Sequence, residues 1–193
     1  MSFINQDDFS EILSKIDNLI KNKDRVLVAI DGMSASGKTS LAKHLQDIYD
    51  CNVFHMDDFF LTEDLRSQDR LNEIGGNVDY IRFDKEVIQG LISGSEFTYQ
   101  VYNCQSLSMT ETVKISPNKL NIIEGAYSMH PTLIDNYDLK ILLKIDPKMQ
   151  SQRILDRNGE TMHDKFINLW IPKENKYLDT FSIEEESDLV IKV

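Results

Sequence analysis

Residues 32–39 read GMSASGKT and match the pattern G-x-x-x-x-G-K-[ST]. The stretch just before them, residues 25–31 (RVLVAID), contains β-branched residues typical of a buried strand. The stretch just after them, residues 40–48 (SLAKHLQDI), has the spacing of an amphipathic helix. A glycine-rich loop between a strand and a helix is the context in which this pattern forms a Walker A phosphate-binding loop. The sequence therefore predicts a binding site for a nucleoside triphosphate.

The residues of this loop have separate expected tasks. The glycines allow successive backbone N–H groups to point at one anion, and the N-terminus of the following helix adds partial positive charge. Lys38 is expected to neutralise the β- and γ-phosphates, and the hydroxyl of Thr39 to ligate Mg²⁺. The nucleotide-binding residues predicted on this basis are Gly32, Ser34, Ala35, Ser36, Gly37, Lys38, Thr39 and Ser40. A plain turn without a ligand is the alternative, and the flanking patterns disfavour it.

The composition is that of an ordinary globular protein. Of the 193 residues, 41% are hydrophobic and 27% are charged, and this length suits one domain. The net charge of −11 argues against a general nucleic-acid binder but allows a local phosphate site. Cys51 and Cys104 have no metal-ligand spacing and are expected to stay reduced. An acidic start and the lack of an apolar run near the ~20 residues of a membrane span predict a cytoplasmic location without a membrane partner.

Strand and helix patterns alternate along the chain. Further strands are predicted at 53–56, 120–123, 139–145 and 189–191, and an antiparallel excursion at 96–102 and 111–115. Helices are predicted from Asp8 to Ile20, from Asp84 to Gly94, over 148–157 and 163–170, and from Pro172 to Leu178. This order predicts an α/β fold of the P-loop NTPase type, with three layers (α/β/α), a mainly parallel central sheet, a small antiparallel β excursion and a helical lid.

Acidic side chains follow several of these strands, at the edge where parallel sheets place their working residues. They are Asp31, Asp57 with Asp58, Glu124 and Asp146. Phosphoryl transfer needs a carboxylate that takes or orients the hydroxyl proton, and Asp57 is the best candidate for this base or for a Mg²⁺ ligand. A turn cap is its alternative role. Glu124 is expected to hold Mg²⁺ directly or through water, whereas Asp146 opens a turn and Asp31 braces the loop.

Two arginines are candidates for the cationic group over the phosphates. Arg153 and Arg157 lie four residues apart on one face of a predicted helix, and Asn158-Gly159 then interrupts that helix. An arginine pair beside a flexible joint suits a lid that closes over phosphates. We therefore expect both arginines to stabilise the transferring phosphoryl group, with a solvated helix face as the alternative.

Several segments resemble the uridine kinase and phosphoribulokinase group, in the same order along most of the chain. They are 32–39, 56–60 (MDDFF), 75–84 (GGNVDYIRFD), 99–103 (YQVYN) and 121–125 (NIIEG). The resemblance implies that Asp57 acts as base on the acceptor hydroxyl and that Glu124 helps to hold Mg²⁺. It also implies that Arg153 and Arg157 belong to an arginine-bearing lid.

The acceptor site is where the chain departs from that group. Phe60 and Tyr102 match residues that line the acceptor pocket there. Tyr102 is not followed by the histidine with which uridine kinases read the nucleobase, and residues 77–80 (NVDY) replace their Asp-His-Pro segment. Uridine specificity therefore does not carry over. The residues predicted to contact a different acceptor are Asp58, Asp79 and Arg82, with exposure to solvent as the alternative for the arginine.

Together these observations predict an ATP- and Mg²⁺-dependent kinase that phosphorylates a hydroxyl of a nucleoside-like metabolite, uridine kinase-like in its machinery. Residues 1–193 are expected to form one kinase domain, with an acceptor-site insertion at about 57–118 and a lid at about 153–165. The same fold could act on pantothenate, a nicotinamide riboside, a sugar or a sugar phosphate. For a sugar phosphate, the extra cations would come from Arg66, Arg70 and Arg82.

Two alternative functions involve no small-molecule acceptor for the phosphoryl group. A regulatory NTPase that reads guanine would carry Asn-Lys-x-Asp after a late strand, but residues 118–121 (NKLN) lack the Asp and precede a strand. A binding module without turnover is expected to lose Lys38, Asp57 or Glu124, and all three are present. The resembling family contains dimers and tetramers, so a homo-oligomer stays open.

Overall fold

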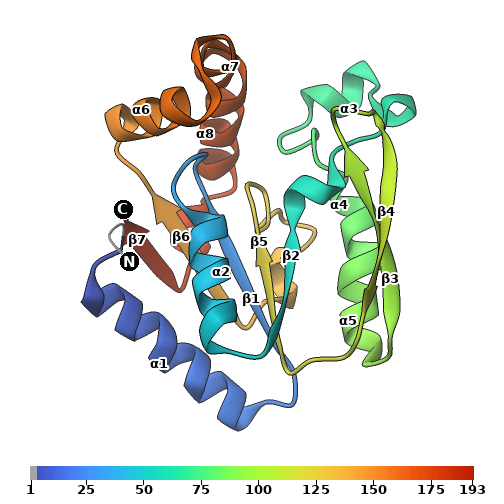
Figure 1. Ribbon diagram of the computed structural model, residues 1–193, viewed down its shortest axis with the longest axis vertical. Coiled ribbons are helices and arrows are strands. Elements are labelled where there is room, and N and C mark those ends of the chain that lie inside the picture. Colours follow the sequence, from blue (N-terminus) through green and yellow to red (C-terminus); the bar gives the residue numbers. More distant parts are fainter. Residues whose placement is uncertain (1–3) are drawn as a thin grey trace.

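The computed structural model describes residues 4–193 and is built around a five-stranded sheet (Figure 1). The strands are β1 (Val26–Gly32), β2 (Cys51–His55), β5 (Leu120–Glu124), β6 (Leu139–Lys144) and β7 (Leu189–Lys192). They pair in the order β2-β5-β1-β6-β7, and every pairing is parallel. Parallel pairing places all the carboxyl ends at one edge of the sheet, and the phosphate loop follows β1 at this edge.

Helices cover both faces of this sheet, which confirms the predicted three-layer α/β/α fold (Figure 1). β1 is buried along its whole length and sends alternate side chains to the two faces. One face packs against α1 (Gln6–Asn22) and α2 (Lys38–Ile48), and the other against the helical segment 80–93 and α8 (Ile171–Thr180). Among residues 4–193, no helix combines the length and apolar character needed to cross a membrane.

The chain leaves the sheet between β2 and β5. A 3-10 turn (Met56–Phe59), a second one (Glu63–Leu65) and α3 (Gln68–Asn72) come first. A continuous helix follows, made of α4 (Tyr80–Phe83), a π-helical turn (Asp84–Ile88) and α5 (Gln89–Ser93). Gly94 ends it with a left-handed φ of 66°, as predicted. β3 (Phe97–Asn103) and β4 (Ser108–Ile115) then form the expected antiparallel hairpin, at the right of Figure 1.

A second group of helices follows β6. Asp146, expected to open a turn, instead caps α6 (Pro147–Asn158) by accepting hydrogen bonds from two backbone N–H groups. Gly159 (φ 74°) interrupts the helix, and α7 (Glu160–Lys165), a π-helical turn (Phe166–Trp170) and α8 then run on as one helix. A short α9 (Ile183–Glu186) precedes β7. In Figure 1, α6 to α8 stand across the carboxyl edge of the sheet from α3.

The helix predicted over 163–170 begins at Glu160, and two other predicted helix starts are also too late. α1 begins at Gln6 rather than Asp8, because the side chain of Asn5 accepts a hydrogen bond from the Asp8 amide at 2.8 Å and caps the helix. The helix expected from Asp84 begins at Tyr80, because the Asp79 side chain accepts a hydrogen bond from the amide of the third helical residue at 3.0 Å. In both cases an earlier Asn or Asp takes the cap.

Candidate active site

A cavity of about 1310 Å³ opens at the carboxyl edge of the sheet. One wall is formed by the phosphate loop with the start of α2, another by α6 to α8, and a third by the segment after β2 and the tip of the hairpin. A pocket for one small ligand usually measures ~300–1,000 Å³, so this cavity has room for two substrates. Six of the predicted nucleotide-binding residues line it, namely Ser34, Ala35, Gly37, Lys38, Thr39 and Ser40. Gly32 and Ser36 lie behind the lining, and Ser36 is fully buried.

The phosphate loop turns tightly from β1 into α2. Gly32 has a φ of 142°, and a Cβ on it would lie 2.2 Å from the carbonyl oxygen of Leu143 on β6, so only glycine fits. Gly37 is left-handed (φ 98°), and α2 begins at the next residue. The ammonium group of Lys38 donates to the carbonyl oxygens of Gly32 (2.8 Å) and Met33 (3.0 Å). The loop thus combines a helix N-terminus with a cation, an arrangement suited to phosphate.

Thr39 and Glu124 meet on the floor of the cavity. The Thr39 hydroxyl donates to Oε1 of Glu124 at 3.1 Å, and Nδ1 of His55 lies 2.6 Å from the same oxygen. His55 is paired with Glu124 in the register of β2 and β5, which explains this contact. Mg²⁺ is commonly held by one or two carboxylates together with substrate phosphates and water, and a hydroxyl beside a carboxylate fits that chemistry. Across residues 4–193, no three His, Cys, Asp or Glu side chains gather into a metal-binding group.

Asp57 lies in the 3-10 turn directly after β2 and lines the cavity. Burial raises the pKa of its carboxyl group above the usual value, and the negative charge of Glu124 raises it further. The positive charges that oppose this rise belong to Lys38, His55 and Arg157. A partly desolvated carboxyl group among opposing charges is typical of a general base.

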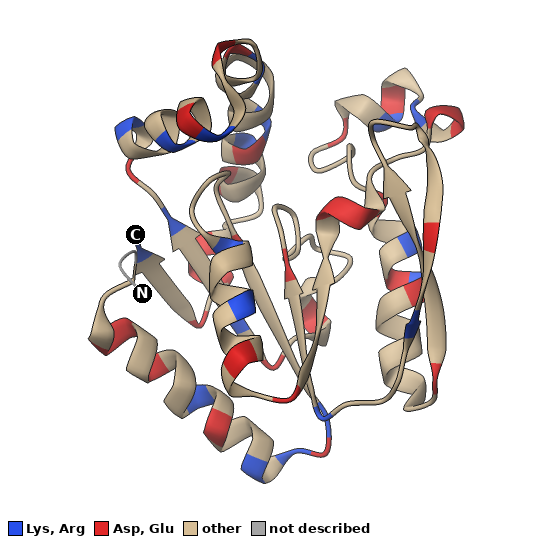
Figure 2. Cartoon of the chain, viewed as in Figure 1, with Lys and Arg blue, Asp and Glu red and all other residues tan. Residues whose placement is uncertain are grey.

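Both predicted lid arginines line the same cavity from α6. The guanidinium group of Arg153 donates to the carbonyl oxygen of Ala35 in the phosphate loop at 3.2 Å. Arg157 lies 5.9 Å from the ring centre of Phe166 and lowers the pKa of Asp57 by its charge. In Figure 2, basic residues of α6 lie across the carboxyl edge of the sheet from the acidic 3-10 turn after β2.

Only one of the residues predicted to contact the acceptor lines the cavity. Phe60 lines the cavity, whereas Asp58 lies outside the lining, with Oδ2 3.5 Å from the hydroxyl oxygen of Tyr99. Tyr102 is buried on β3, outside the lining, and its hydroxyl group has no hydrogen-bond partner among residues 4–193. Contact of Asp58 and Tyr102 with an acceptor stays a prediction.

Asp79 and Arg82 also lie outside the lining and hold the insertion together. Asp79 caps α4, and the Arg82 guanidinium donates to the carbonyl oxygens of Asp58 (2.9 Å) and Gln100 (2.7 Å). The same guanidinium group lies 4.1 Å from the ring centre of Phe59. Arg82 is therefore not the solvated side chain of the alternative interpretation, and its contact with an acceptor stays a prediction, as does that of Asp79.

Two side chains that were not predicted as site residues hold the phosphate loop. Glu174 on α8 accepts hydrogen bonds from the backbone N–H of Ser34 (2.9 Å) and from its hydroxyl group. Gln150 on α6 donates to the Ser34 carbonyl oxygen at 3.0 Å. Both side chains are buried, although Glu and Gln are usually exposed. The available signal is that Glu174 lies three residues before Tyr177 and so shares its apolar helix face.

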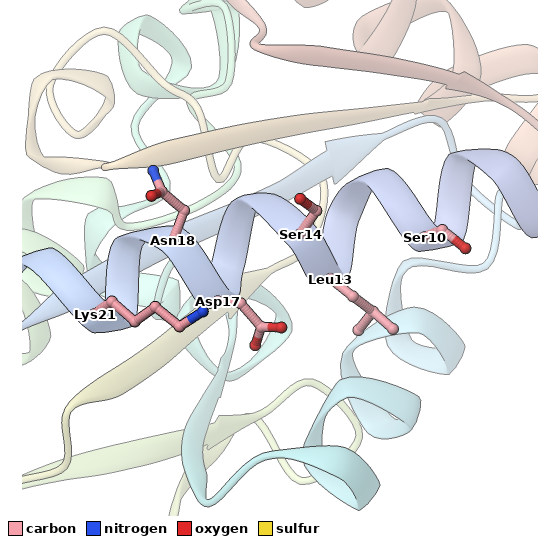
Figure 3. A pocket seen from close by; sticks show the side chains of 6 residues that line it. All are labelled: Ser10, Leu13, Ser14, Asp17, Asn18 and Lys21. Atoms are coloured by element: carbon pink, nitrogen blue, oxygen red, sulfur yellow. The ribbon is translucent and has the colours of Figure 1, made fainter.

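A second hollow, of about 500 Å³, lies along the outer face of α1 (Figure 3). Its lining comes from this one helix and consists of Ser10, Leu13, Ser14, Asp17, Asn18 and Lys21. It shares no residue with the large cavity. The chemistry suited to a nucleotide is therefore gathered in the large cavity.

The family model described as "Phosphoribulokinase / Uridine kinase family" matches residues 27–162 of this chain. This match covers well over half of the sequence. The chain belongs to this family. Members of this family are kinases, which transfer a phosphoryl group to an alcohol acceptor.

Individual relatives of this chain agree with the family assignment. A phosphoribulokinase from Synechocystis sp. is 24% identical over 179 residues, which are 87% of this chain and 53% of that protein. The chain thus spans about half the length of this curated relative. A solved structure described as a possible uridine kinase from Bacillus stearothermophilus is 25% identical, with a TM-score of 0.67 over 93% of this chain and 98% of the other. The YGR205w protein is 16% identical over 95% of this chain and 91% of its own, and its TM-score of 0.60 shows a shared fold.

Proposed function

We propose that this protein uses ATP and Mg²⁺ to phosphorylate a hydroxyl group of a small nucleoside-like metabolite. The observation that carries the proposal is the convergence of Lys38, the Thr39–Glu124 pair and Asp57 at one end of one cavity. These are the cation, metal-binding and base functions that phosphoryl transfer requires. The residues present fit MgATP, because the loop offers a helix N-terminus and Lys38, and Thr39 and Glu124 offer oxygen ligands.

The residues of the kinase divide the reaction between them. When bound, MgATP supplies the γ-phosphoryl group, and its metal ion neutralises charge on the phosphate oxygens. Asp57 accepts the proton of the acceptor hydroxyl as the new O–P bond forms and the bond from the γ-phosphorus to the β–γ bridging oxygen breaks. Lys38, Arg153 and Arg157 supply positive charge to the phosphate oxygens.

A nucleoside-like acceptor is supported by the aromatic residues of the cavity. Phe60, Phe166 and Trp170 all line it, so a flat ring bound there would have aromatic neighbours. Similarity over nearly the whole chain to the possible uridine kinase from Bacillus stearothermophilus also supports a nucleoside-like acceptor.

Release of ADP with MgATP tests this proposal across a panel of neutral, cationic and anionic alcohols. The panel consists of uridine, cytidine, nicotinamide riboside, pantothenate, simple sugars and ribulose 5-phosphate. Stimulation by a nucleoside that disappears in Asp57→Asn supports the proposal. Binding of ATP without stimulation by any nucleoside would contradict the proposed acceptor class.

A second candidate is an acceptor that carries its own negative charge. Arg66, Lys165 and Lys173 line the cavity, and none of the three has a carboxylate within 4.0 Å among residues 4–193. Arg66 and Lys173 are anchored instead by the carbonyl oxygens of Leu61 (3.0 Å) and Leu71 (3.5 Å). In a chain with a net charge of −11, unpaired cations in one cavity favour an anionic ligand. Stimulation by pantothenate or ribulose 5-phosphate, lost in Lys173→Met and kept in the exposed control Lys176→Met, would favour this candidate.

A further inference from the structure

Both backbone polar groups of Ser34, the third residue of the phosphate loop, are held by side chains from the C-terminal helices. Glu174 of α8 accepts from the Ser34 N–H, and Gln150 of α6 donates to the Ser34 carbonyl oxygen. The Ser34 hydroxyl also donates to Glu174. Glu174 and Gln150 are 6% and 2% exposed, so bulk water has little access to either side chain. Hydrogen bonds to a buried charged group are among the stronger ones in proteins.

The next residue explains why such support is needed. Ala35 has a φ of 62°, the left-handed conformation that residues with a Cβ rarely adopt. Such a conformation persists only where the surrounding structure over-determines it. Arg153 holds the carbonyl oxygen of Ala35 at 3.2 Å, directly after the residue that Glu174 and Gln150 hold. The turn at residues 34–35 is therefore fixed from outside the loop.

α8 also contacts the chain on the other side of Gly32. The hydroxyl group of Tyr177, three residues after Glu174, donates to Oδ2 of Asp31 at 2.7 Å. Asp31 in turn accepts hydrogen bonds from the N–H groups of Gly32 (2.6 Å) and Met129 (2.8 Å). One face of one helix thus holds both the residue before the loop and the loop itself.

We infer that Glu174 is a positioning residue, which fixes the turn at Ser34–Ala35 in the shape that binds nucleotide and couples this turn to α8. The inference rests on the proposed use of ATP. The ammonium group of Lys38 is held by the carbonyl oxygens of Gly32 and Met33, directly before Ser34. A change in the turn therefore moves the cation that meets the β- and γ-phosphates.

The two hydrogen bonds from Ser34 to Glu174 allow a positioning role of this side chain to be distinguished from an effect of its negative charge. A carboxylate beside a phosphate site repels the ligand, so its charge works against nucleotide binding. Glutamine at position 174 can keep both bonds, because its oxygen accepts from the Ser34 N–H and its amide donates to the Ser34 hydroxyl. Alanine keeps neither. If positioning is the role, Glu174→Gln binds nucleotide at least as tightly as the natural protein, and Glu174→Ala binds it more weakly.

Hydrogen exchange in the nucleotide-free protein tests the contact without any assumption about ATP. The backbone N–H of Ser34 should exchange about tenfold faster or more in Glu174→Ala than in the natural protein, since its acceptor is gone. Glu174→Gln should retain the protection. Asp179→Ala, which removes a carboxylate from the exposed side of the same helix, is the matched control. Equal exchange at Ser34 in the alanine variant and the natural protein would overturn the inference.

Calorimetric titration with MgATP then tests the consequence. Glu174→Ala should weaken the affinity for MgATP about tenfold or more, and Glu174→Gln should not. Equal weakening in both variants would show that the hydrogen bonds kept in Glu174→Gln do not set the affinity, and would overturn the positioning role. If Glu174→Ala does not fold, Ser34→Ala removes the hydroxyl half of the contact, and an unchanged affinity there would also count against it. A natural protein that does not bind MgATP would contradict the proposed function itself, whatever the exchange at Ser34 shows.

Discussion

His55 and Glu124 lie side by side at the ends of β2 and β5, with Nδ1 of the imidazole 2.6 Å from Oε1 of the carboxylate. Because the same oxygen accepts the Thr39 hydroxyl at 3.1 Å, the carboxylate is held from both sides. The hydrogen bond to Glu124 raises the pKa of His55, since the charged imidazole is the stronger partner. The orientation of the proposed metal-binding carboxylate thus depends on a residue that faces it from the neighbouring strand.

His55→Ala should therefore weaken Mg²⁺ binding. A partner that orients a metal-binding side chain typically contributes about 10- to 100-fold in metal affinity, and we expect a loss near the lower figure. The measurement is the affinity for ATP as a function of free Mg²⁺ concentration. His44→Ala on α2, whose ring packs on Phe9 at 5.1 Å, is the control. The same Mg²⁺ dependence in His55→Ala and in the control would show that Glu124 does not need this contact.

Asp57→Asn should lower turnover by about 10²- to 10⁴-fold while leaving the affinity for MgATP nearly intact, because the amide cannot accept the proton. Turnover with the stimulating acceptor and calorimetric titration with MgATP measure the two effects separately. Asp58→Asn should lose less, since its side chain is turned toward Tyr99 rather than into the cavity. Normal turnover in Asp57→Asn would remove this residue from the reaction.

Lys38→Ala should weaken both the affinity for MgATP and the rate. Charge-assisted hydrogen bonds to phosphate are strong, so we expect a loss of about 10- to 100-fold in affinity. Lys43→Ala, an exposed lysine on the same helix, controls for a general change in charge. Unchanged affinity in Lys38→Ala would contradict the interpretation of residues 32–39 as a phosphate loop.

The parts of the site that are formed by residues close together in the sequence could be predicted from it. The loop at residues 32–39, the strand before it and the helix after it follow from spacing alone, and the structure has β1 and α2 there. The acids after β2 and β5 could be placed at one edge because parallel strands share a direction. Gly94 and Gly159 were readable as helix ends because glycine favours a left-handed φ.

Contacts between distant segments could not be predicted in this way. Ser34 and Glu174 are 140 residues apart, and no local pattern says that α8 packs against the loop. The sequence around His55 has no metal-ligand spacing that marks it, and its contact with Glu124 depends on which strands pair. Arg82 was ambiguous because a helix start does not show that the side chain turns back onto the ring of Phe59.

A histidine far from the chemistry should make stability depend on pH. His130 is buried between two aromatic rings, stacked on Tyr80 at a centroid distance of 3.9 Å and edge-to-face with Phe181 at 5.7 Å. Arg70 lies 4.0 Å from the centre of the Tyr80 ring. Burial, and then the positive charge of Arg70, lower the pKa of His130 to about 4 from its usual 6.5. The folded protein therefore holds a neutral imidazole where the unfolded chain binds a proton.

Between pH 6.5 and about 4, only the unfolded state carries this proton, so His130 lowers the free energy of unfolding as the pH falls through that window. A permanently neutral ring in His130→Phe should remove this dependence. Relative to the variant, the natural protein should lose about 1–3 kcal/mol between pH 7 and pH 4.5, measured by urea unfolding. Carboxyl groups whose pKa is raised, such as Asp31 and Glu174, act in the opposite sense but equally in both proteins. Parallel pH profiles for the two proteins would show that His130 is protonated in the folded state as easily as in the unfolded chain.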